Sequence, residues 1–459
     1  MTAASVVARA FAIAAPLPFL YAAFPVETVA FWLIVITFQS LVGALTGVMP
    51  TVAMQMTAYA RTGSSTVGGR MEDHAHDRVD GPNWPLIAEI NRNTLWLFAA
   101  IVVVWIVFAA TVGTLIVWRP MMASGIVTEA GGAWAIFIIG SAFRLLAQPF
   151  AAFNMGFGAV AEVRRQEALS WLMGGLAAVA TLSFIPSLPL AMLAVQAPIL
   201  LNFVQYRRLA HRLGWSAGKA SGSTMVQREL WSRGWRGGIG TFAGMLTIYG
   251  NGFLFAQVGG GAQTAAYLLG LNILGIVGQI AFSGVHAASP ALATRFAQGR
   301  EVEMNDIAQR VIGRSMRVFV LLVLLAPIAV ACLNAMLPTP VAFPDNVLWL
   351  TMCVAAMLVR HGGDHLQYYT TTNDIRWHIV NPVFLVLSLG PFLFLPASNV
   401  MLLVLVQLAA AALFYLPYAR WLTRKHLAYG FRCEFKDFGL PMTIMLIGLL
   451  GLSVIAPAL

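Results

Sequence analysis

Charged residues are scarce in this sequence of 459 amino acids, and that scarcity limits what the protein can be. Asp, Glu, Lys and Arg together make up only 10% of the chain, whereas a typical soluble domain carries about 25%. Apolar residues make up 59%, and the mean hydropathy is +0.78. This composition excludes an ordinary water-soluble protein and indicates that much of the chain faces lipid.

Cysteine is also rare. The three cysteines, Cys332, Cys353 and Cys433, lie in or beside apolar stretches and show no C-x-x-C spacing. The sequence therefore offers neither a zinc-finger pattern nor a disulfide framework. We interpret the cysteines as small apolar packing residues, and the sequence predicts no cofactor and no metal.

Long apolar runs make up most of the chain. Each run is long enough to cross the hydrocarbon layer of a membrane, which takes about 20 residues in a helix. We predict an all-α integral membrane protein with twelve transmembrane helices and a candidate for a thirteenth near the C-terminal end. The runs cover residues 6–24, 29–53, 94–118, 131–153, 167–185, 187–206, 237–258, 263–288, 315–337, 346–370, 377–396, 399–419 and 438–457.

The basic residues predict how these helices are oriented. Nearly all of the 28 Lys and Arg residues fall in loops of one side, and positively charged loops stay in the cytoplasm. The exceptions are Arg119, in a loop of the opposite side, and Arg144 and Arg360, inside predicted helices. We expect a multi-pass membrane protein with a cytoplasmic N-terminus. The net charge of +10 then reflects topology, and we expect no nucleic-acid partner.

The two halves of the chain share landmarks, which indicates an internal repeat. Thr28-Val29-Ala30-Phe31 in the first half corresponds to Thr264-Ala265-Ala266-Tyr267 in the second, and each half has one arginine inside a helix. We predict an N-terminal lobe of six helices at 1–206, a cytoplasmic linker at 207–236, a C-terminal lobe of six helices at 237–420, and a basic juxtamembrane segment with the extra helix candidate at 421–459.

These landmarks resemble a known family. Glu27-Thr28-Val29-Ala30-Phe31-Trp32, and Tyr267 followed by Ser289-Pro290-Ala291-Leu292-Ala293 and Gly299, look like the polysaccharide flippase branch of the multidrug/oligosaccharidyl-lipid/polysaccharide (MOP) exporter superfamily. The resemblance covers most of the twelve helices. It implies two pseudo-symmetric six-helix lobes around a central cavity that opens alternately to either side of the membrane.

The resemblance also implies a substrate. Wzx-type members of the superfamily act in polysaccharide biosynthesis, such as that of O-antigen. They flip a polyprenyl-diphosphate-linked oligosaccharide from the cytoplasmic to the periplasmic leaflet, so the resemblance implies a location in the bacterial inner membrane. The implied partners are this lipid-linked substrate, membrane lipids and a polysaccharide polymerase.

Arg144 and Arg360 need a reason to lie inside helices, because an arginine at the bilayer centre costs at least about 2.5–3.5 kcal/mol. One interpretation is that they line the cavity, one in each lobe, and bind the diphosphate of the substrate. The other is structural. Arg360 can pair with Asp364 one turn later, and Arg144 can bond the kinked backbone near Pro149.

The run from Arg360 to Gln367 is the most polar stretch inside a predicted helix, and it places His361 and His365 on one face. His361, Asp364 and His365 are candidates for hydrogen bonds to sugar hydroxyls, and proton transfer or metal binding are the alternatives. His286 and Asn251 are further candidates for substrate contact, with interhelical packing as the alternative. The loop His74-Ala75-His76-Asp77 is polar and cytoplasmic, and we assign it no site.

Three other functions of helical membrane proteins fit this sequence less well. By the same resemblance, a cation-coupled multidrug exporter should have an acidic residue in its first helix, and Ala10 to Phe24 contains none. A membrane-embedded glycan polymerase or ligase needs a substantial extracytoplasmic loop, and the loops predicted on that side are short. A lipid II flippase resembles a protein of fourteen helices, which is more than the twelve or thirteen that this sequence predicts. We therefore predict a transporter and not an enzyme.

Overall fold

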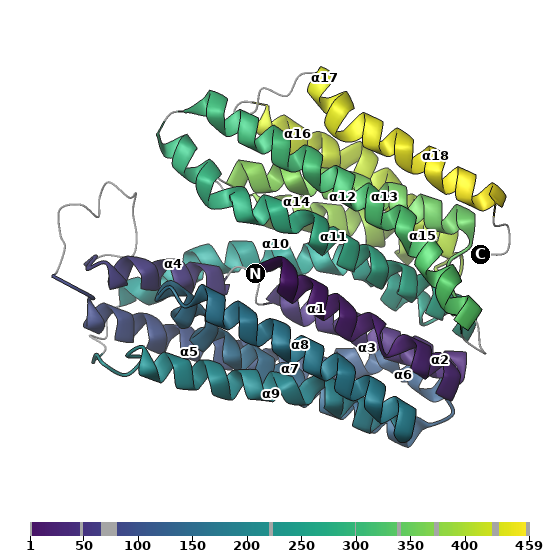
Figure 1. Ribbon diagram of the computed structural model, residues 1–459, viewed down its shortest axis with the longest axis horizontal. Helices are drawn as coiled ribbons and strands as arrows, with labels where there is room; N and C mark the ends of the chain where they lie inside the picture. Colours follow the sequence, from purple (N-terminus) through teal and green to yellow (C-terminus); the bar gives the residue numbers. More distant parts are fainter. Residues whose placement is uncertain are drawn as a thin grey trace. The chain divides into compact units, whose positions relative to one another are not determined.

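The computed structural model describes residues 2–45, 49–65, 80–219, 224–298, 300–336, 341–370, 376–424 and 431–455. Within these ranges the chain forms helices and connecting turns, with no β-sheet (Figure 1). The contacts divide the chain into two compact units, and each is described by itself. Unit 1 comprises Met1–Phe19, Phe38–Met121 and Ile126–Phe242, and unit 2 comprises Leu20–Thr37, Met122–Gly125 and Ala243–Leu459.

Most helices of the first half of the chain lie in unit 1, and the chain changes unit within α2, α3, α6 and α10. A π-helical turn, Ala109–Gly113, joins α5 to α6. The helices are α1 (Thr2–Ala14), α2 (Leu17–Ala23), α3 (Val26–Leu45), α4 (Met49–Arg61), α5 (Trp84–Phe108), α6 (Thr114–Ala123), α7 (Val127–Gly156), α8 (Val160–Phe184), α9 (Leu188–Arg212) and α10 (Thr224–Phe255).

Unit 2 contains the remaining helices, three of which are joined to short irregular turns. The 3₁₀ turn Gly390–Leu393 follows α14, and the π-helical turns Ala411–Tyr415 and Phe435–Gly439 lie before α16 and α18. The helices are α11 (Gly261–Ala297), α12 (Glu301–Met336), α13 (Asn346–Thr370), α14 (Trp377–Leu389), α15 (Val400–Ala410), α16 (Leu416–Thr423), α17 (Phe431–Glu434) and α18 (Leu440–Ile455).

Each of the thirteen predicted apolar runs coincides with a helix or a helix pair. In the part of the chain that the structure describes, ten helical segments are long and apolar enough to cross a membrane, and Trp377–Leu393 is a shorter apolar segment. The runs at 237–258 and 346–370 correspond to α10 and α13, which contain more polar residues. The candidate for a thirteenth helix is present as Phe435–Ser453, so the all-α fold with many membrane-length helices is confirmed.

The predicted lobes and linker stay a prediction, and helices extend into the predicted linker from both sides. The predicted linker at 207–236 is helical up to Arg212 and again from Thr224, and the contacts change unit between Phe242 and Ala243. The apolar pattern marks only where a helix enters lipid. Arginine is a good helix former, so a helix can extend past the lipid without any signal in hydropathy.

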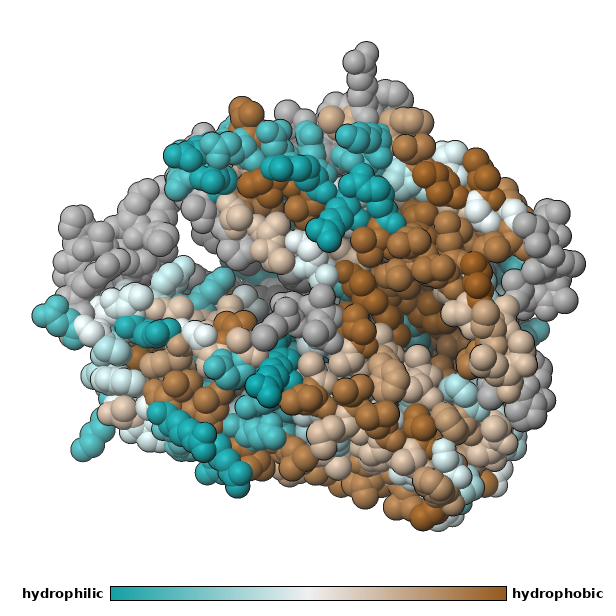
Figure 2. Space-filling view, in the orientation of Figure 1, coloured by the Kyte–Doolittle hydropathy of each residue, from teal (hydrophilic) through white to brown (hydrophobic). Residues whose placement is uncertain are grey.

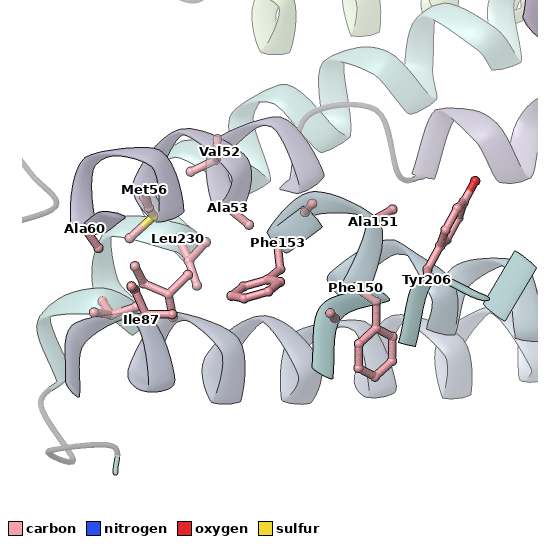
Figure 3. Packing of buried hydrophobic residues seen from close by; sticks show 14 of the residues in the cluster. Val52, Ala53, Met56, Ala60, Ile87, Phe150, Ala151, Phe153, Tyr206 and Leu230 are labelled. Carbon is pink, nitrogen blue, oxygen red and sulfur yellow. The ribbon is translucent and has the colours of Figure 1, made fainter. Parts of the chain in front are cut away.

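A buried apolar cluster holds the helices of unit 1 together at one end. Side chains from α4, α5, α7, α9 and α10 meet there, and Phe153 and Ile87 are among the most buried (Figure 3).

Helices α7 and α9 approach closely because Gly140 has no side chain. A Cβ at Gly140 would lie 2.5 Å from Oε1 of Gln196. Small residues at such contacts are typical of helix packing in lipid.

Large apolar side chains also cover much of the protein surface. Figure 2 shows hydrophobic residues over broad continuous areas of the visible face. Exposed examples come from both units and include Trp96, Leu115, Phe184, Phe394 and Leu413. A water-soluble monomer rarely exposes large continuous patches of this kind, so this surface is suited to contact with lipid tails.

Candidate functional site

Helix α13 of unit 2 carries the polar run that the sequence singled out, and the fold buries it. His361 and Asp364 are fully buried, and His365 is nearly so. Burial at this point depends on Gly362, because a Cβ there would lie 2.8 Å from Cδ1 of Tyr415. The missing side chain lets the segment with Tyr415 pack directly against α13.

Arg360 and Asp364 form a tight ion pair on α13. Nη2 of Arg360 lies 2.6 Å from Oδ1 of Asp364, and the guanidinium stands over the Phe282 ring at 3.8 Å from its centroid. The pair that the i, i+4 spacing allows is therefore present. A paired, ring-stacked guanidinium has part of its hydrogen-bonding capacity already used.

The two histidines of α13 contact the C-terminal part of the chain. Nε2 of His361 lies 3.2 Å from Oε1 of Glu434, and Nη2 of Arg420 lies 2.9 Å from the other carboxylate oxygen. His361 also stacks on Phe438, with ring centroids 4.4 Å apart. Nδ1 of His365 lies 3.1 Å from Oγ1 of Thr423. The histidines thus belong to a network that joins α13, α16 and α17.

Sequence reasoning did not select Glu434, Arg420 or Thr423 for this network. They lie in or beside the segment that the sequence marks as basic and juxtamembrane, where charges are normally solvated. The available signal was the excess of polar groups in α13, since buried charges need partners. That signal predicts that partners exist without showing which residues they are.

Asn251 and His286, the remaining candidates of unit 2, have different outcomes. Asn251 is fully buried on α10, and its Nδ2 lies 3.2 Å from Oε1 of Gln407 and 3.3 Å from the carbonyl oxygen of Leu403. This amide connects two helices. His286 lies in α11, and its side chain is outside the described residues, as are Gly299 and the loop His74-Ala75-His76-Asp77.

Arg144 is the candidate of unit 1, and it lies against an aromatic ring that a second arginine also contacts. The guanidinium of Arg144 is 5.1 Å from the centroid of Trp171, and that of Arg9 is 5.6 Å from it. Both distances are within the range of cation–π attraction. Arg9 of α1 also donates to Oγ of Ser40 at 3.4 Å. Sequence reasoning counted Arg9 only as a topology charge and did not select Trp171.

The acidic groups around Arg144 do not neutralise it. Glu167 is engaged with Arg164 at 2.7 Å. Among the described residues Arg144 forms no ion pair, and its Nη1 is buried without a hydrogen-bond partner. A buried donor left without an acceptor costs about 1–3 kcal/mol, more when it is charged. This arrangement of Arg9, Arg144 and Trp171, here called the arginine–tryptophan cluster, can accept an anion.

Comparison with known proteins identifies the fold. No family model matches the sequence, and no curated protein matches it. A solved structure of the lipid II flippase MurJ in an inward closed conformation is similar, with a TM-score of 0.60 and 10% identity over 98% of this chain and 92% of that chain.

Two solved structures of MATE transporters are similar to the same degree. A MATE structure in a bent conformation gives a TM-score of 0.60 and 13% identity over 93% of this chain and 94% of that one. An outward-facing multidrug resistance MATE family transporter of the MOP superfamily gives 0.59 and 12% over 92% and 95%. The chain therefore has the two-lobed fold that MurJ and the MATE transporters share.

Proposed function

We propose that the protein is a flippase that moves a polyprenyl-diphosphate-linked oligosaccharide from the cytoplasmic to the periplasmic leaflet by alternating access. The observation that carries this proposal is the arginine–tryptophan cluster of unit 1. Two guanidiniums lie within about 6 Å of the centre of the Trp171 ring, and no carboxylate among the described residues pairs with Arg144.

A diphosphate suits this cluster in charge. Two like charges beside one ring repel each other, and an anion close to both reduces that repulsion. Guanidinium groups bind phosphate oxygens through paired, charge-assisted hydrogen bonds. The buried Nη1 of Arg144 would gain the acceptor that it lacks in this structure. Binding then relieves an unfavourable arrangement, which favours an occupied state.

Arg360 has a secondary role in this mechanism, because Asp364 already pairs with it. The head group meets Arg144 and Arg9 of unit 1, and Arg360 of unit 2 can contact an anion only where its ion pair with Asp364 opens. The sugar chain follows the diphosphate through the protein, while the polyprenyl tail stays in lipid. The fold is compatible with this process, since a lipid II flippase has a similar structure.

Transport in proteoliposomes tests the proposal. Radiolabelled undecaprenyl-diphosphate oligosaccharide is supplied on one leaflet, and its appearance on the other is measured for wild type, Arg144→Ala and Arg9→Ala at equal amounts of folded protein. We expect both variants to lose at least about tenfold in transport rate, with Arg360→Ala less affected. Arg119→Ala, a change at an exposed arginine of α6, is the matched control.

The results separate this function from its alternatives. Wild-type rates in both Arg144→Ala and Arg9→Ala would return these arginines to a structural role and remove the basis of the proposal. The rival function is cation-coupled drug export, which the similarity to MATE transporters favours. Uptake of a cationic dye driven by a proton or sodium gradient, without any flipping of the lipid, would select that function instead.

A further inference from the structure

The network at the end of α13 contains a set of side chains that is typical of a metal site. One nitrogen each from His361 and His365 and one oxygen from Glu434 all lie within 4.8 Å of one another. Both histidines are buried, and the Glu434 side chain is only 12% exposed. In the part of the chain that the structure describes, no other group of three such residues is brought together.

The residue types and their spacing fit a transition metal. Two histidines and one glutamate form a known ligand set for Zn²⁺, and histidines at i and i+4 of a helix present their rings to one ion. Tetrahedral Zn²⁺ with bonds of about 2.0–2.2 Å holds its ligand atoms about 3.4 Å apart. Nε2 of His361 and Oε1 of Glu434 are already 3.2 Å apart, so this pair needs little movement.

The surroundings constrain both rings, and a hydrogen bond orients that of His365 as a metal would require. Thr423 donates from its hydroxyl to the carbonyl oxygen of Ala419 at 3.2 Å, so its oxygen can accept from Nδ1 of His365 at 3.1 Å. In that tautomer Nε2 of His365 carries the lone pair that binds a metal. Metal-binding histidines usually donate their second ring nitrogen in this way. Phe438 stacks on His361 and restricts the rotation of that ring.

Arg420 is the cation that pairs with the Glu434 carboxylate in this structure. Its guanidinium lies 2.9 Å from Oε2 of Glu434, and its side chain is 39% exposed, so it can turn toward solvent. Arg360 is balanced by Asp364. A divalent cation between His361, His365 and Glu434 would therefore compete chiefly with Arg420, and removing that arginine should strengthen metal binding.

We propose that His361, His365 and Glu434 bind one divalent transition metal of the Zn²⁺ type, which fastens α17 and the following π-helical turn to α13. The proposal is independent of the transported substrate, because it rests on these three ligands alone. The metal thereby restrains the start of the C-terminal helix α18, which directly follows that turn.

Metal content of the full-length protein in detergent tests the proposal. The purified chain is stripped with a chelator, dialysed against ZnCl₂ and measured by elemental analysis, and Co²⁺ is added in parallel to report tetrahedral coordination by visible absorption. We expect one Zn²⁺ per chain and a higher unfolding temperature with metal than without. A wild-type chain that retains no metal and shows no thermal shift contradicts the proposal.

Variants separate this site from other histidines. His361→Ala and Glu434→Gln should lose the bound metal, and Thr423→Ala should weaken binding about 10–100-fold. Arg420→Gln keeps all three ligands and should bind Zn²⁺ more tightly, which also guards against loss of binding through misfolding. The double variant His74→Ala, His76→Ala is the matched control and should bind as wild type. Loss of metal in that control, with retention in His361→Ala, would overturn the assignment.

Discussion

Nη2 of Arg360 lies 2.6 Å from Oδ1 of Asp364, one turn later on α13, and the carboxylate is fully buried. Each charge is tolerated there because the other neutralises it. Breaking a buried ion pair by removing one partner costs about 3–5 kcal/mol, whereas replacing both partners by apolar residues is often neutral. The pair therefore stabilises unit 2 only as long as both members are present.

The first prediction concerns this pair. Asp364→Ala should lower the thermal unfolding temperature in detergent strongly, because it leaves Arg360 beside Phe282 without its anion. The double variant Arg360→Met, Asp364→Leu should recover most of the lost stability. Unfolding followed by tryptophan fluorescence measures both. An Asp364→Ala protein as stable as wild type would show that water or another acidic group compensates Arg360.

The sequence predicted contacts within a helix of this region and missed contacts between helices. The Arg360–Asp364 pair could be predicted because both residues lie on one helix, where spacing determines which side chains meet. The contacts of His361 with Glu434 and of Arg144 with Trp171 join separate helices. No periodicity relates such residues, so they became visible only once the helices were packed.

The same contrast holds for the fold. Among the described residues, each apolar run that hydropathy located coincides with a helix or a helix pair, because crossing lipid imposes a length and a composition on a helix. The change of contact unit between Phe242 and Ala243 has no signal in hydropathy, since α10 runs through it without a break. The pattern of apolar residues reports contact with lipid, and the division into units depends on contacts between helices.

The second prediction concerns Gly362, which allows close packing against Tyr415. Gly362→Ala places a Cβ 2.8 Å from Cδ1 of Tyr415, and overpacking of this kind costs about 1–3 kcal/mol. Gly278 on α11 is the matched control, because a Cβ there meets nothing within 4 Å. Gly278→Ala should be neutral or stabilise the helix by up to about 1 kcal/mol. Equal unfolding temperatures for the two variants would refute the close contact at Gly362.

The third prediction concerns Trp171, the ring that Arg9 and Arg144 both contact. Trp171→Phe keeps an aromatic face for the guanidiniums, while Trp171→Leu keeps apolar bulk and removes the face. A cation–π contact is worth about 0.5–2 kcal/mol, so Trp171→Leu should reduce lipid-linked substrate transport by up to about 30-fold, with Trp171→Phe between it and wild type.

Transport rate alone does not separate a positioning role of Trp171 from damage to the fold, so the assay needs a second measurement. The concentration of inorganic pyrophosphate that halves transport reports how well the arginines hold a diphosphate. If the ring orients Arg9 and Arg144, this concentration should rise in the order wild type, Trp171→Phe, Trp171→Leu, while the unfolding temperatures of the two variants stay similar. If pyrophosphate inhibits all three proteins equally, the ring does not orient the arginines, and the lower transport of the variants has another cause.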